Sequence, residues 1–232
     1  MDDREPQDEA NILSESLATG TSIPEISNWR AALLIGTVTC NTFIAVMLAG
    51  VLVVSLPTMA RDLGLSDDLV LWPASVGALA CGCTLLLSGS VTDVVGGRRI
   101  YLTGTFLLTL TTIASGLSRT GIELILFRAA QGAALSLCFP SSVILITSNM
   151  PTGTYRNIAF AYLGAGQPVG FSIGLVLGGV LLESIGWRYS IYIGAIVNFS
   201  VFIISIFGIP AVAASETQSF STIGQRLKTE ID

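Results

Sequence analysis

Six long hydrophobic runs, separated by short polar segments, dominate the chain. They lie at about 31–56, 69–91, 100–117, 121–147, 158–182 and 189–209, and each has at least 18 residues. A helix needs roughly 20 residues to cross the ~30 Å hydrocarbon core of a bilayer. The runs show none of the alternation between apolar and polar residues that membrane strands have. The pattern therefore predicts an all-α membrane protein with six transmembrane helices.

The composition supports a membrane protein and divides the chain into three parts. Hydrophobic residues make up 51% of the chain and charged residues only 12%, whereas soluble domains are about 25% charged. Residues 1–30 are rich in acids and do not resemble a secretory signal, which begins with basic residues. We predict a disordered acidic cytoplasmic tail over 1–30, a six-span bundle over 31–209 and the start of a cytoplasmic loop over 210–232.

The distribution of basic residues predicts the orientation in the membrane. With the N-terminus inside, the cytoplasmic segments carry Arg4, Arg30, Arg98, Arg99, Arg156, Arg226 and Lys228. The external loops then carry only Arg61, Arg119 and Arg188. The positive-inside rule favours this arrangement, with both termini in the cytoplasm. We expect the plasma membrane rather than a vacuolar or other internal membrane.

Cysteine and histidine usage excludes several classes of protein. All four cysteines (Cys40, Cys81, Cys83 and Cys138) fall inside predicted spans, where small apolar packing is their common role. The chain contains no histidine, which excludes a haem held by two histidines and a serine–histidine intramembrane protease. No metal, no cofactor and no nucleic-acid partner is expected, and we expect no enzymatic activity.

The fifth run carries glycines at helical spacing. The stretch GAGQPVGFSIGLVLGG (164–179) places Gly166, Gly170, Gly174 and Gly178 on one face of a helix. Small residues at spacing four allow two helix backbones to approach closely in a membrane. Pro168 removes one helix hydrogen bond, and the pair ending at Gly179 adds a second point of weakness. We predict a close helix contact here that slides or bends when the protein changes conformation, although ordinary packing would give the same stripe.

The fifth run also carries a family resemblance. GLVLGG (174–179) resembles the antiporter motif of the major facilitator superfamily, with Leu175 where that motif has proline. Together with GWRYSIYI (186–193), the run looks like fungal drug-efflux members of this superfamily, the drug:proton antiporters. The resemblance implies export rather than uptake.

The segment after the second run resembles the loop signature of the same superfamily. In GSVTDVVGGRRIYL (89–102) the matching residues are Gly89, Asp93, Gly96, Arg98 and Arg99. Val94 and Gly97 stand where the signature has basic residues. We expect Asp93 and the two arginines to form charge-assisted bonds that hold neighbouring helix ends together.

The fourth run holds a charged residue in a predicted span. RAAQG (128–132) resembles the superfamily's arginine–glutamine–glycine signature, with Arg128, Gln131 and Gly132 matching. An arginine within a span costs about 2.5–3.5 kcal/mol on insertion scales, so it needs a partner or water. Glu123, five residues away, is on a different face of the helix. We expect Arg128 to face a central cavity, where it binds an anionic group or influences a proton acceptor; snorkelling is the alternative.

The resemblance covers about residues 30–210 and implies one half of a transporter. The superfamily fold has two six-helix bundles, each a pair of inverted three-helix repeats, around a cavity that opens alternately to each side. The chain matches the first bundle, so we expect a fragment or a truncated form whose second bundle is supplied in cis or in trans. The polar residues Asn41, Gln131, Gln167 and Asn198 are candidates to line the cavity, or to bond neighbouring helices.

Two functions remain open from the sequence. One is efflux of small organic molecules, drugs or secondary metabolites, across the lipid bilayer. The other is a membrane protein without transport activity, or a bundle that assembles with a partner. Proton coupling also stays open, because no Asp or Glu lies deep in a predicted span.

Overall fold

Six long helices form the part of the chain that the computed structural model describes, residues 28–150 and 153–209. They are α2 (Asn28–Asp62), α3 (Trp72–Val95), α4 (Gly97–Leu117), α5 (Gly121–Asn149), α6 (Thr154–Ser184) and α7 (Trp187–Gly208), with a short 3₁₀ helix η1 (Asp67–Leu69) before α3. Each long helix is long and apolar enough to span a membrane. The predicted six-helix all-α fold is confirmed. The predicted tail, except its last three residues, and the predicted loop lie outside the described residues.

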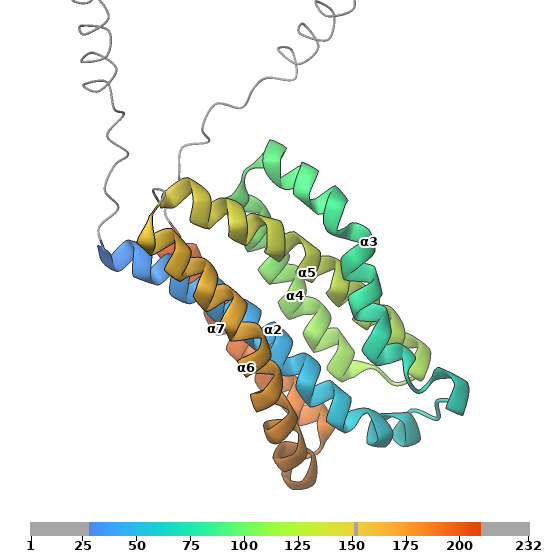
Figure 1. Ribbon diagram of the computed structural model, residues 1–232. Coiled ribbons are helices and arrows are strands. Elements are labelled where there is room, and N and C mark those ends of the chain that lie inside the picture. The colour runs from blue at the N-terminus through green and yellow to red at the C-terminus, as the bar shows by residue number, and fades with distance from the viewer. Residues whose placement is uncertain (1–27, 151–152, 210–232) are drawn as a thin grey trace, which may run out of the picture.

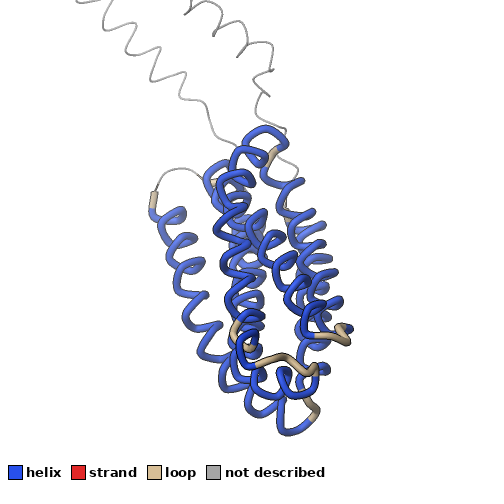
Figure 2. The backbone as a smooth tube through the Cα atoms, turned by 90° about the vertical axis from the view of Figure 1, so that its right-hand side faces the viewer, coloured by secondary structure: helices blue, strands red, loops and turns tan. Residues whose placement is uncertain are grey.

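The helices pack as two related groups of three (Figure 1). Helix α2 packs against α6 and α7, whereas α5 packs against α3 and α4, and α4 and α7 also contact each other. Exchanging α2, α3 and α4 for α5, α6 and α7 converts the first set of contacts into the second. The two repeats along the chain are therefore α2–α4 and α5–α7. Because each repeat has three spans, the second repeat crosses the membrane in the opposite direction to the first. The packing is therefore that of two inverted three-helix repeats, and Figure 2 shows the helices running along one common direction.

The two equivalent contacts, α3 with α5 and α2 with α6, are held together differently. Between α3 and α5, the hydroxyl of Thr84 donates to that of Ser136 at 2.8 Å, and Ser88 donates to the Ser136 carbonyl at 2.7 Å. Between α2 and α6 the contact is made by glycines. Hydrogen bonds from hydroxyl groups fix the register of α3 on α5, and this contact too includes a close glycine approach, at Gly132.

The glycine stripe of α6 lies directly against the backbone of α2. The contacts join the pairs Gly166–Thr39, Gly170–Phe43, Gly174–Met47 and Gly178–Val51. A Cβ atom at Gly170 would lie 2.8 Å from the Phe43 carbonyl oxygen, and one at Gly174 would overlap the Met47 carbonyl oxygen. The close helix contact predicted from the glycine spacing is confirmed. Helix α6 continues through Pro168, which is exposed, and the predicted sliding or bending stays a prediction.

Side chains at the predicted outer end tie three helix ends together. The Trp187 indole, at the start of α7, donates to the carboxylate of Asp62 at the end of α2, at 2.8 Å. The Arg188 guanidinium lies 4.5 Å over the Trp187 ring and donates to the carbonyl of Gly116, near the end of α4. Because Gly116 has one of the last carbonyls of α4, Arg188 satisfies a group that the helix leaves unpaired.

Helices α3 and α6 contribute least to the buried core. Only Pro73, Ser88 and Thr92 are buried on α3, and the buried residues of α6 are mostly its small ones. Large apolar side chains instead point away from the bundle on both helices, among them Leu86 at 84% and Val176 at 69% exposure. In lipid such surfaces need no cover, since hydrocarbon tails are as apolar as leucine.

Candidate functional site

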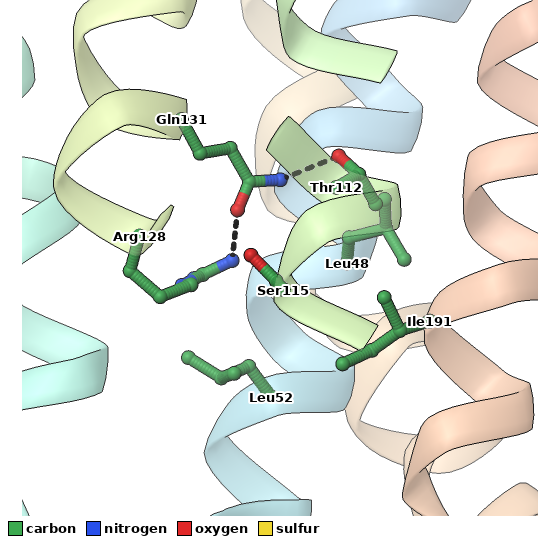
Figure 3. Close-up of a pocket in the computed structure, with 7 residues that line it drawn as sticks. All are labelled: Leu48, Leu52, Thr112, Ser115, Arg128, Gln131 and Ile191. Carbon is green, nitrogen blue, oxygen red and sulfur yellow. Dashed lines mark hydrogen bonds between the residues drawn. The ribbon is translucent and has the colours of Figure 1, made fainter. Parts of the chain in front are cut away.

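Arg128 on α5 is the centre of a polar group that joins three helices (Figure 3). Its Nη1 donates to the Gln131 side-chain oxygen at 2.6 Å, and the Gln131 amide donates to the Thr112 hydroxyl of α4 at 2.8 Å. Its Nε donates to the Pro73 carbonyl of α3 at 3.3 Å. Arg128 and Gln131 are three residues apart and share one face of α5. The arrangement positions the guanidinium between α3 and α4, and we call Arg128, Gln131 and Thr112 the arginine relay.

Gly132 explains how α3 comes within reach of Arg128. A Cβ atom at Gly132 would overlap the carbonyl oxygen of Gly77, so only glycine allows the α3 backbone to lie this close to α5. Pro73 is one turn before Gly77, and its carbonyl oxygen therefore reaches the Arg128 side chain. All three residues matched in RAAQG thus contribute to one site: a cation, its positioning amide and the close helix contact.

A small cavity lies beside the relay, inside the bundle. It is lined by Leu48 and Leu52 of α2, Thr112 and Ser115 of α4, Arg128 and Gln131 of α5, and Ile191 of α7 (Figure 3). Its volume of about 10 Å³ is close to the space that one water molecule occupies. Arg128 thus faces the bundle interior next to a mostly apolar pocket, and this part of the site holds an atom or two rather than a whole substrate.

Glu123 does not pair with Arg128. Its carboxylate accepts hydrogen bonds from the backbone N–H groups of Arg119 and Thr120, and the Thr120 hydroxyl accepts from the Glu123 N–H. This is a capping box at the start of α5. The expectation that Glu123 is a poor partner for the arginine is confirmed.

The other polar residues at mid-span are buried or half-buried. Asn41 and Asn198 are buried at 0% and 1% exposure, and Gln167 is half-buried on α6. The Asn198 amide donates to the Thr109 hydroxyl of α4 at 3.2 Å. Of the two roles left open by the sequence, the geometry of Asn198 fits a bond between helices, whereas Gln131 has both roles because it bonds Thr112 of α4 and lines the small cavity.

Asn41 is the most unusual of these residues. Neither its side-chain oxygen nor its nitrogen has a hydrogen-bond partner among the described residues, and both atoms are buried. An unsatisfied buried polar group costs about 1–3 kcal/mol. We therefore expect Asn41→Leu, which is similar in size, to raise the thermal unfolding temperature of the purified chain in detergent.

Asn198→Leu is the matched comparison for this prediction. It removes the bond to Thr109 along with the buried amide, so its unfolding temperature should rise less than that of Asn41→Leu. A fall in the unfolding temperature of Asn41→Leu would contradict the expectation, because it would mean that Asn41 makes a stabilising bond, for example through water.

The loop signature lies at the turn between α3 and α4. Gly96 ends α3 with φ of 98°, a left-handed conformation that favours glycine, and α4 begins at the next residue. The Arg98 side chain donates to the carbonyl of Ile206, near the end of α7, at 3.1 Å. Asp93 and Arg99 are exposed, and no atom lies within 4 Å of the Cβ position at Gly89. Of the three residues expected to bond neighbouring helix ends, Arg98 does so, to a backbone carbonyl, whereas the side chains of Asp93 and Arg99 form no such bond among the described residues.

Thr112, Ser115 and the Pro73 carbonyl were not predicted from the sequence. Helix α4 contains five threonines, at 103, 105, 109, 111 and 112, and all five donate to a carbonyl of their own helix. Nothing in the local sequence distinguishes Thr112 from the others. A backbone carbonyl carries no sequence signal at all.

Comparison with known proteins identifies the family. Residues 38–229 match the Major Facilitator Superfamily. The chain is 44% identical over 186 residues to MFS-type transporter 1 of Pyricularia oryzae, covering 80% of this chain and 30% of the relative. It is 36% identical to a puromycin resistance protein of Streptomyces alboniger and 34% identical to a cephamycin export protein of Amycolatopsis lactamdurans. These matches cover 65% and 63% of this chain and 30% of each relative.

The solved structures agree with the fold. A crystal structure of the peptide transporter POT in complex with sulfate, an E310Q mutant, superposes with a TM-score of 0.73 at 15% identity, over 90% of this chain and 45% of that one. At this identity the likeness shows the fold alone. The chain belongs to the Major Facilitator Superfamily and is an integral, multi-pass membrane protein. It spans about 30% of the length of the curated relatives that it matches.

Proposed function

We propose that this chain is the amino-terminal bundle of an exporter of small organic molecules, and that it transports them together with a second six-helix bundle. The observation that carries the proposal is the arginine relay, a charged group within the membrane beside a cavity that both repeats line. Carriers built from inverted repeats bind their substrates near the membrane midplane, where the repeats meet. The chain acts as a carrier, without enzymatic chemistry.

Two observations favour export as the direction and drugs or secondary metabolites as the cargo. Two relatives are named for puromycin resistance and for cephamycin export. The α6 glycine stripe resembles the motif associated with export, and it makes the close contact with α2 described above. Proton coupling stays open. Every Asp and Glu whose side chain the structure describes (Asp62, Asp68, Asp93, Glu123 and Glu183) is exposed and lies in a loop or near a helix end.

The test is export of fluorescent compounds from cells that lack their own pumps. Three proteins are compared at equal membrane abundance: this chain alone, this chain fused to the part of the Pyricularia oryzae relative that follows the matched region, and that following part alone. We expect export only from the fusion. Export by the chain alone would contradict the need for a second bundle, and a well-expressed fusion that exports none of a broad compound set would contradict the export function.

The proposed orientation places the N-terminus in the cytoplasm, and the membrane we propose is the plasma membrane. We expect Ala18→Cys, in a variant whose four native cysteines are replaced by alanine or serine, to resist membrane-impermeant thiol reagents in intact cells. The physical reason is the excess of basic residues in the segments on the N-terminal side. Gly64→Cys, in the loop between α2 and η1, is the matched control and should be labelled. Labelling of position 18 before lysis would reverse the topology.

A further inference from the structure

Arg128 carries a charge within the membrane that none of the described residues near it neutralises. Of the charged residues in ranges 28–150 and 153–209, only Arg128 lies more than one turn from both ends of its helix. Both acceptors that its side chain reaches, the Pro73 carbonyl and the Gln131 amide oxygen, are neutral. The acids are exposed at helix ends and in loops, as described above. The interior of this bundle therefore has one net positive charge.

The guanidinium also has donor capacity left over. Nε and Nη1 are engaged, whereas Nη2 has no hydrogen-bond partner among the described residues. Nη2 is not fully buried, because it keeps some surface that solvent can reach. The site is therefore a cation held in place by the arginine relay, with the two N–H groups of Nη2 unpaired among the described residues and partly accessible.

These two observations restrict the chemistry of the ligand. A single positive charge in an apolar setting favours a single negative charge, because a dianion would leave a net charge of the opposite sign in the same place. With Nε bound to Pro73 and one N–H of Nη1 bound to Gln131, the free donors are the second N–H of Nη1 and both N–H groups of Nη2. The adjoining cavity of about 10 Å³ has room for about one water-sized group. A carboxylate that places one oxygen on these free N–H groups fits both the single positive charge and the small cavity.

We propose that Arg128 recognises a carboxylate, so that the cargo of this transporter is a monoanionic small molecule. The claim that the anion is the transported cargo rests on the proposed function. The anion site itself is a property of this bundle and does not depend on transport. The same carboxylate chemistry could also come from an acidic side chain of the second bundle. The experiments below separate a free ligand from such an internal partner.

The direct test measures binding to the purified chain in detergent by thermal unfolding at constant ionic strength. The probes are 2-naphthylacetate, its uncharged amide 2-naphthylacetamide, and 2-naphthyl phosphate, a dianion at pH 8. A ligand that binds only the folded state raises the unfolding temperature with its concentration. We expect 2-naphthylacetate to raise the unfolding temperature by a few degrees, and the amide and the phosphate to raise it by less than a third as much.

Variants identify the residue responsible. Arg128→Gln should abolish the shift caused by 2-naphthylacetate, whereas Arg119→Gln, which removes an exposed arginine near the same end of the bundle, should retain it. An equal shift from the amide, or a shift that persists in Arg128→Gln, overturns the proposal. If Arg128→Gln does not fold, the comparison of acid with amide on the unaltered chain still decides the matter.

Export assays separate this inference from the proposed function. If the fusion exports cationic and neutral dyes but no carboxylates, the anionic cargo is wrong and the exporter stands. If the chain binds 2-naphthylacetate through Arg128 but the fusion does not bind it, an internal acid occupies the site and the cargo claim is overturned. If both bind and the carboxylates are exported in competition with 2-naphthylacetate, the inference is supported.

Discussion

Gly174→Leu is expected to remove most of the folded protein from the membrane. Even the first side-chain atom at this position would overlap the Met47 carbonyl oxygen of α2, so α6 and α2 must separate along their shared length. Overpacking in a tight contact costs about 1–3 kcal/mol and occasionally more, and here the clash is with backbone, which cannot rotate away. We expect membrane abundance, measured by blot in cells, to fall about fivefold or more.

Gly179→Leu is the matched control for this variant. Gly179 is on the same helix and in the same motif, yet no atom lies within 4 Å of its Cβ position. We expect its abundance to stay within about twofold of the unaltered chain. Should Gly174→Leu be as abundant as Gly179→Leu, and the fusion carrying it export normally, the close contact of α6 with α2 would have no importance for folding or transport.

Arg128 is expected to resist replacement even by lysine. Arg128→Ala removes the cation and leaves the Gln131 oxygen and the Pro73 carbonyl without their donor. Arg128→Lys keeps the charge, but an ammonium group cannot reproduce the planar set of donors that reaches Gln131 and Pro73 together. Each charge-assisted bond is worth about 1.5–3 kcal/mol, which corresponds to about 10- to 150-fold in rate.

The measurement is the initial rate of dye export by the fusion protein, corrected for abundance. We expect both variants to lose at least about tenfold, with Arg119→Lys unchanged because that side chain is exposed. If Arg128 only snorkels toward the interface, lysine should restore the rate almost fully. Normal export by Arg128→Ala at equal abundance would show that the arginine relay has no part in transport.

Arg128 could be predicted from the sequence, but its hydrogen-bond partners could not. The cost of a charge in hydrocarbon is a property of the residue type, so the run from 121 to 147 was enough to predict that Arg128 needs a partner or water. The identity of the partners depends on which helices pack together. The Pro73 carbonyl is 55 residues away along the chain, and it comes within reach only because Gly132 allows α3 to approach.

Asn41 and Asn198 also show what the sequence could not predict, because their roles differ in the structure although their local sequences look alike. In the sequence they are two polar residues in apolar runs, equally suited to line a cavity or to bond a helix. The structure gives Asn198 a partner on α4 and leaves Asn41 buried without one. Burial and pairing are set by the way the helices pack together, which the residues near each asparagine do not encode.

The sequence by itself determined the number of spans, the glycine face and the superfamily. Membrane-length apolar runs without strand alternation fold as helices, because every backbone N–H and C=O group must be hydrogen-bonded within lipid and a helix does this within one segment. Glycines at spacing four fix a smooth face by helix geometry alone. Only the tertiary structure decided that α2 receives this face, that hydroxyl bonds join α3 to α5, and that Thr112 rather than another threonine completes the arginine relay. Lipid tails favour no particular pairing among apolar helices, so the choice of neighbours comes from the fit of whole surfaces and is absent from any single segment.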